Sequence, residues 1–90
     1  MTSVKVYVEV VSRTLTNGRM LPQSIVWENG VCYDIDRVSD VRQAASMRCG
    51  GQGDRYTVWI GGKMSYLYFE RNCSVTGPNI GRWFVERKTN

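Results

Sequence analysis

Residues 4–11 alternate between valine and other side chains, with Lys5, Tyr7 and Glu9 separating four valines. Successive side chains of a β-strand point to opposite faces of a sheet, so this pattern predicts a strand with one dry face. Thr16-Asn17-Gly18 then predicts a turn, and a second extended segment is expected over residues 24–28. The chain therefore begins with the pattern of an antiparallel sheet.

Asn29-Gly30 predicts a hairpin turn, and the facing of the flanking side chains selects the loop length. A two-residue loop would place Trp27 on the same face as two aspartates. A three-residue loop pairs Trp27 with Val31 instead and leaves Gly30 in the left-handed position of a bulge. We expect the longer loop. The resulting apolar face carries Ile25, Trp27, Val31, Tyr33 and Ile35.

Gly61-Gly62 predicts the two-residue turn of a second hairpin, between strands over residues 55–60 and 63–71. This register pairs Ile60 with Lys63 and Val58 with Ser65. One face of the ribbon then carries Tyr56, Val58, Ile60, Leu67 and Phe69. The opposite face carries Arg55, Thr57, Trp59, Met64, Tyr66 and Tyr68. A half-buried sheet alternates dry and wet positions, whereas both faces of this ribbon are rich in large apolar side chains.

The stretch from Asp36 to Met47 allows two interpretations. Ser39 can cap a short helix over residues 39–47, or the segment can continue as extended chain. Residues 49–54 are glycine-rich and are expected to form a loop, and residues 81–87 form a last strand. Six short strands in 90 residues predict a single all-β domain over residues 1–90. We expect a six-stranded small barrel, SH3-like or related, with at most one short helix.

Composition narrows the function classes. The chain has no histidine, which excludes Ser-His-Asp and Cys-His catalysis, and its three cysteines contain no Cys-x-x-Cys pair. Apolar runs are too short to span a bilayer, and Lys5 and Glu9 interrupt the N-terminal valines, which is unlike a secretory signal. We therefore expect a cytoplasmic chain with no membrane partner, no cofactor and no metal. Asp34 and Asp36 are the only carboxylate pair that suggests Mg²⁺-dependent phosphoryl transfer, a third-ranked alternative to a non-catalytic role.

The second face of the Gly61-Gly62 ribbon suggests three interpretations. Residues 37–53 or the C-terminus can cover it within one chain, a second copy can cover it in a homodimer, or it can bind nucleic acid. In the last case Trp59, Tyr66 and Tyr68 stack on bases while Arg55 contacts phosphate. A net charge of +4 favours a polyanion, although the basic residues are dispersed. Arg48, Gly50 and Gly51 form a weaker candidate, a glycine-rich nest for an anion.

Residues 22–86 also carry a succession of short motifs. They are Pro22, Ile25-Val26-Trp27-Glu28-Asn29-Gly30, Tyr33-Asp34-Ile35-Asp36-Arg37-Val38, Gly50-Gly51-Gln52-Gly53-Asp54-Arg55-Tyr56 and Arg82-Trp83-Phe84-Val85-Glu86. This succession resembles a family of small Firmicutes proteins, and more distantly short actinobacterial proteins, whose genes often lie near Y-family, translesion DNA polymerases. The resemblance implies a bacterial cytoplasmic β domain with an accessory role in DNA damage tolerance. It assigns no function to individual residues. The sequence thus predicts a non-catalytic binding module for nucleic acid, with a protein-interaction or homodimerisation module as the alternative.

Overall fold

The computed structural model describes residues 2–45, 52–71 and 80–89, and within these ranges the chain is entirely β-structure. Seven strands form one antiparallel sheet in the order β3-β2-β1-β7-β6-β5-β4. The all-β prediction is therefore confirmed. The strands are β1 (Thr2–Thr14), β2 (Met20–Val26), β3 (Cys32–Asp34), β4 (Arg37–Ala45), β5 (Gln52–Ile60), β6 (Lys63–Arg71) and β7 (Gly81–Thr89).

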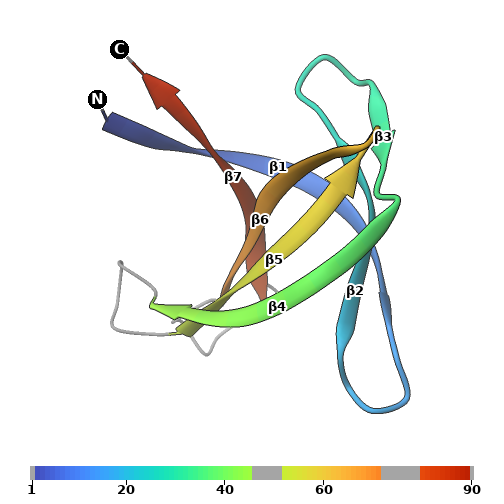
Figure 1. Ribbon diagram of the computed structural model, residues 1–90. Coiled ribbons are helices and arrows are strands. Elements are labelled where there is room, and N and C mark those ends of the chain that lie inside the picture. Colours follow the sequence, from blue (N-terminus) through green and yellow to red (C-terminus); the bar gives the residue numbers. More distant parts are fainter. Residues whose placement is uncertain (1, 46–51, 72–79, 90) are drawn as a thin grey trace.

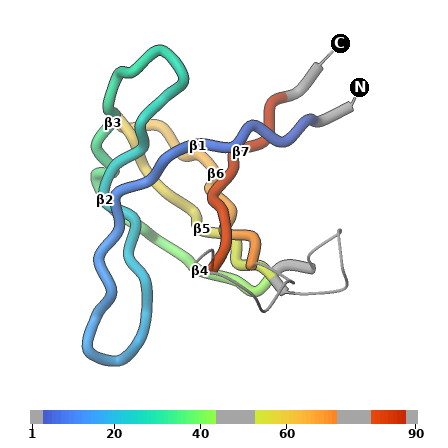
Figure 2. Tube along the Cα trace, turned by 180° about the vertical axis from the view of Figure 1, so that it is seen from behind, coloured from blue at the N-terminus to red at the C-terminus, as the bar shows by residue number. Residues whose placement is uncertain are grey.

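The sheet curls into a half-barrel, and its first and last strands, β1 and β7, lie side by side in the middle of the strand order (Figure 1). β3 and β4 follow each other in the chain but occupy opposite edges of the sheet. The chain crosses from one edge to the other at Ile35 and Asp36. Two backbone hydrogen bonds hold this crossing: Ile35 N donates to Gln23 O (2.9 Å), and Asp36 N donates to Trp59 O (2.7 Å). This crossing closes one end of the half-barrel, as the view from behind also shows (Figure 2).

Both predicted hairpins have the expected registers. Ile60 pairs with Lys63 and Val58 with Ser65, and the two glycines of the β5–β6 turn have φ values of 59° and 80°. Such positive φ values are the requirement of a type I′ turn, which glycine satisfies at no steric cost. In the first hairpin the Trp27 amide donates to Val31 O (2.9 Å), which confirms the three-residue loop.

The predicted strand count is wrong, because residues 37–45 form an additional strand. The helix over residues 39–47 is therefore absent as far as Ala45, and Ser46 and Met47 lie outside the described residues. Pairing with β5 gives this segment its backbone hydrogen bonds, whereas an isolated helix of this length is only marginally stable in water. The expected loop over residues 49–54 is likewise wrong for Gln52, Gly53 and Asp54, which begin β5.

The hydrophobic core lies on the concave face of the half-barrel. Val58 and Leu67 are fully buried at its centre. Their neighbours come from four further strands, β1, β2, β4 and β7, as well as from β5 and β6, so the core joins segments that are distant in sequence. The Tyr56 hydroxyl donates to Met20 O (3.2 Å) and ties β5 to the start of β2. The buried cluster consists of Ile25, Tyr56, Val58, Leu67, Phe69 and Trp83.

Glycines on both sides of β6 allow its neighbours to approach closely. A Cβ built on Gly53 of β5 would lie 2.7 Å from the carbonyl oxygen of Phe69. A Cβ on Gly81 of β7 would lie 2.6 Å from the carbonyl oxygen of Glu70 and 2.6 Å from the Phe69 ring. Real Cβ atoms do not tolerate such contacts, so the tight approach of β5 and β7 to β6 depends on glycine at both positions.

We expect Gly81→Ala to lower the free energy of unfolding by about 1–3 kcal/mol, because the added methyl group must displace backbone and a core ring. Urea denaturation measures this change. Gly30→Asn is the matched control, since Gly30 has open space around it and asparagine tolerates its positive φ of 84°. Equal stability of the Gly81→Ala variant and the wild type would show that β7 can move away from β6 at no cost.

Candidate functional site

Aromatic side chains form a continuous row on the convex side of the sheet, which we call the outer face. Tyr68 of β6 pairs with Phe84 of β7, and Phe84 pairs with Tyr7 of β1. The Tyr68 and Phe84 rings stack in parallel with centroids 4.9 Å apart, and Tyr7 meets Phe84 edge to face at 5.8 Å. These neighbours leave Phe84 only 5% exposed. The outer face therefore contains a small apolar cluster that is separate from the concave core.

Four cations lie over rings of the outer face. Arg37 covers Trp59 at 4.5 Å from the ring centroid, and Arg55 covers Tyr66 at 4.6 Å. On the other half of the face, Arg82 lies over Tyr7 at 4.0 Å and Lys5 over Phe84 at 4.7 Å. The quadrupole of an aromatic ring attracts a cation above its face, so each pair holds both side chains in place. The resulting surface alternates rings and positive charges.

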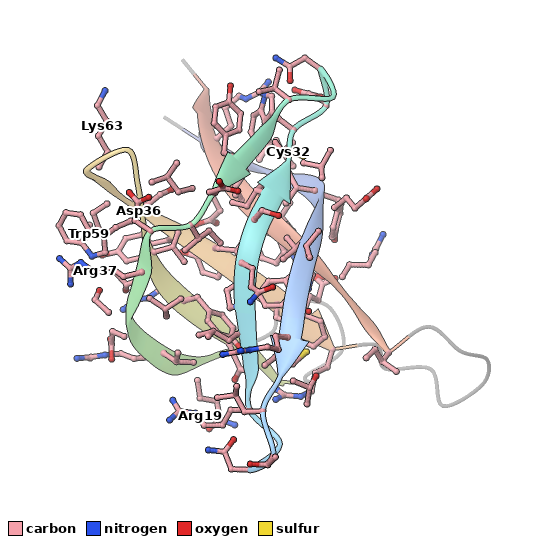
Figure 3. All side chains as sticks on the ribbon, turned by 90° about the vertical axis from the view of Figure 1, so that its right-hand side faces the viewer. Arg19, Cys32, Asp36, Arg37, Trp59 and Lys63 are labelled. Atoms are coloured by element: carbon pink, nitrogen blue, oxygen red, sulfur yellow. The ribbon has the colours of Figure 1, made fainter. Side chains whose placement is uncertain are left out.

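The Trp59 end of the outer face is organised by a β-bulge in β4. Arg37 pairs with Trp59 and Asp40 with Thr57, which leaves Ser39 as the extra residue. The Ser39 hydroxyl accepts a hydrogen bond from the Trp59 indole nitrogen (3.1 Å). Arg37 and Trp59 lie next to each other at the edge of the sheet and extend away from it (Figure 3). The bulge thus anchors the polar edge of the indole, while the guanidinium lies on its face.

Glu70 joins three strands beneath the other end of the outer face. Its carboxylate accepts hydrogen bonds from Lys5 Nζ (2.6 Å) and from the Tyr7 hydroxyl (3.1 Å), and Arg82 lies 3.6 Å away. The hydrogen bond from Lys5 lowers the pKa of Glu70, and the bond from Tyr7 adds to this effect against the opposing influence of burial. This network pairs both cations on the β1–β7 side of the face, Lys5 and Arg82, with one carboxylate.

Arg37 and Arg55, on the β4–β5 side, are not paired with any described carboxylate in this way. Within the described residues, neither Arg37 nor Arg55 forms an ion pair with a carboxylate. The Nε atom of Arg55 is buried and has no hydrogen-bond partner there. Positive charge is therefore available to a ligand around Trp59 and Tyr66. The ion-paired cations of the described residues are Lys5, Arg42, Arg71, Arg82 and Arg87.

The structure brings together the four residues predicted as the main contact set. Arg55, Trp59, Tyr66 and Tyr68 all lie on the outer face, and none belongs to the concave core. Tyr66 is 40% exposed, whereas Tyr68 is partly covered by its stacking on Phe84. Burial and a hydrogen bond with Glu86 raise the pKa of Tyr68. Tyr68 therefore supports the surface, while Tyr66 is accessible on it.

The other sequence-based candidates receive less support. Arg48, Gly50 and Gly51 lie outside the described residues. Asp34 and Asp36 are both exposed, and no group of three or more carboxylate, histidine or cysteine residues that could hold a metal occurs in the described ranges. Residues 37–45 do not fold over the outer face, because they extend the sheet as β4. No helix within these ranges has the length and apolar character needed to cross a bilayer.

The sequence-based contact set omits several residues that shape the surface. Arg37 was missed because β4 was not recognised as a strand, so its pairing with Trp59 was not considered. The sequence does carry a signal for this strand. Charged residues 37, 40 and 42 alternate with valines 38 and 41, which is the pattern of a strand with one bulge. Tyr7 and Phe84 were missed because they meet only through the pairing of β1 with β7, the two ends of the chain.

The described residues thus define a class of structure: an all-β half-barrel whose outer face carries rings and cations. Comparisons of the chain with protein-family models, with curated proteins and with solved structures found no match. The SH3-like type therefore stays a prediction. The functional argument rests on the outer face itself.

Glu70→Gln tests the network beneath the face. The pKa of folded Glu70 lies below its ordinary value of 4.5. Its stabilisation is therefore complete above that value and is lost as the pH falls through the lower folded pKa. We expect the variant to lose about 1.5–3 kcal/mol of unfolding free energy at neutral pH, and this difference should shrink under acid conditions.

Urea denaturation over a series of pH values measures this dependence, with the exposed Glu9→Gln as the control. A difference between wild type and Glu70→Gln that does not change with pH would contradict the stabilising role of the Glu70 carboxylate.

Proposed function

We propose that the chain is a non-catalytic module that binds single-stranded nucleic acid on the outer face. One observation carries the proposal: Arg37 and Arg55 each lie on an aromatic ring and have no carboxylate partner within the described residues. Their positions beside Trp59 and Tyr66 are set by intramolecular stacking, so little side-chain freedom is lost when an anion binds. A guanidinium held in this way has N–H groups free for a phosphate.

A site for single-stranded nucleic acid also requires an exposed apolar surface on which a base can lie. Tyr66 is 40% exposed and Met64 is 49% exposed, and both lie on β6 next to β5, the strand of Arg55. Bases stack on aromatic side chains with little dependence on sequence, because every base has a π-face. The surface therefore combines phosphate contacts from β4 and β5 with a stacking position on β6.

A single strand fits this surface better than a duplex. The rings lie along a convex sheet, and only an unpaired base can leave its own stack to lie on a protein side chain. Single-stranded DNA is also the form expected from the implied accessory role in DNA damage tolerance. We therefore choose it as the ligand to test.

A homodimer is the second candidate, and the same exposed side chains favour it. Tyr7, Met64 and Tyr66 leave a patch of apolar surface on the outer face, at 38%, 49% and 40% exposure. Aromatic residues and methionine are enriched in the cores of protein interfaces. Light scattering distinguishes the two: a stable dimer that Tyr66→Arg dissociates would assign the face to a second copy.

We expect a fluorescein-labelled single-stranded oligonucleotide of mixed sequence to bind at low salt, as measured by fluorescence anisotropy. If Arg37 and Arg55 each neutralise one phosphate, log K should fall with log salt with a slope of about −1.4. Arg37→Ala should reduce the magnitude of this slope by about 0.7. Tyr66→Ala should weaken binding by about 5-fold to 100-fold and leave the slope unchanged, because it removes a stacking ring but neither arginine charge.

Tyr33→Ala is the matched control for Tyr66→Ala. Tyr33 is 42% exposed but lies on β3, away from the outer arginines, so its removal should leave binding unchanged. Equal losses for the two variants, or no binding even at low salt, would refute the outer face as the nucleic-acid site.

A further inference from the structure

The half-barrel is not closed between β2 and β4, which flank an opening that we call the seam. These two strands are not paired within the described residues, and β4 is the last strand of the sheet order. A cavity of about 380 Å³ occupies the seam, lined on one side by Leu15, Arg19, Met20 and Leu21 and on the other by residues 38–41. Figure 3 shows the seam from the side, with β4 and β2 running along its two borders.

The two borders of the seam are unequal as hydrogen-bonding edges. Pro22 of β2 has no N–H group and lies next to a bulge at Gln23 of the same strand, so β2 is a poor edge for pairing there. β4 is nine residues long, has no proline and one bulge, at Ser39, and within the described residues it pairs only with β5. An edge strand presents unpaired N–H and C=O groups to any extended segment that approaches it. A guest strand would therefore pair with β4.

Side chains at the edge of β4 specify what such a guest must carry. Val38 and Val41 point toward the core side, where Leu15, Met20 and Leu21 supply the apolar part of a cavity whose lining also includes polar side chains. On the outer side β4 carries Arg37, Asp40 and Arg42, and the Asp40 carboxylate is already bonded to Arg42 (2.7 Å).

Arg19, at the cavity, has no ion pair with a carboxylate within the described residues. The edge therefore offers apolar contacts inward and an excess of positive charge at Arg19 and Arg37.

We propose that the seam is a docking site for an extended peptide segment of a partner protein, which adds to the edge of β4 beside Val38–Arg42. Its inward side chains are apolar and fill the cavity, and its outward side chains are acidic and lie beside Arg37 and Arg42. Main-chain bonds to an edge strand provide affinity in this mode of recognition, and alternate side chains provide specificity. The proposal does not depend on nucleic-acid binding, because the cavity lies on the opposite side of the sheet from Tyr66 and only Arg37 borders both surfaces.

The test uses a fluorescein-labelled peptide of about eight residues, a usual strand length, in which valine and glutamate alternate. We expect it to bind the full chain, as measured by anisotropy, and to slow amide exchange in β4 but not in β6. Two further peptides test the pattern: one of the same composition with valines and glutamates in separate blocks, and one that alternates valine with lysine. Both should bind at least about five-fold more weakly.

Two charge reversals test the location. Arg42→Glu should weaken binding of the valine–glutamate peptide about five-fold or more, because its side chain is 70% exposed beside the seam and the variant places acid against acid. Lys63→Glu is the matched control, since it makes the same charge change in the distant β5–β6 turn and should leave binding unchanged. Tyr66→Ala should also leave peptide binding unchanged.

Three results would overturn the proposal. The first is equal binding of the alternating and block peptides, which would show a purely electrostatic attraction. The second is an equal effect of Arg42→Glu and Lys63→Glu, which would remove the seam as the location. The third is displacement of the peptide by the oligonucleotide together with loss of peptide binding in Tyr66→Ala, which would place both ligands on the outer face.

Discussion

The register of the β5–β6 ribbon is the constraint on which the rest of the structure depends. Two glycines with positive φ at the turn place Val58 opposite Ser65 and Tyr56 opposite Leu67. Because side chains alternate between faces, a slip of one residue in either strand would exchange its core side chains with its outer side chains. This turn therefore decides at once which side chains build the concave core and which form the convex surface.

The ribbon is apolar on both sides, and the two sides are stabilised differently. The concave side packs against β2 and β7 to exclude water from the buried core. The outer side has no covering layer within the described residues, and cations lie over its rings instead. Long basic side chains can cover apolar surface while their charged ends stay in contact with water. The same arrangement that stabilises the rings leaves guanidinium groups in position for an anion.

Closure of the barrel is incomplete for a physical reason. The crossing from β3 to β4 joins the two edges at one end through single hydrogen bonds at Ile35 and Asp36. Beyond this point Pro22 and the bulge at Gln23 interrupt the border of β2 that faces β4. The fold thus has two accessible surfaces on opposite sides of one sheet, and Arg37 lies at the β4 edge between them.

The β class, the registers of both glycine hairpins and the core face of the β5–β6 ribbon follow from the sequence alone, because they depend on neighbouring residues and a period of two. Tertiary structure decided that residues 37–45 form a strand, since only the edge of β5 gives that segment its hydrogen bonds. It also decided the partners of Trp59 and the burial of Glu70, where Lys5 comes from the opposite end of the chain. Contacts between distant segments depend on how the sheet curls, and no local pattern records that curl.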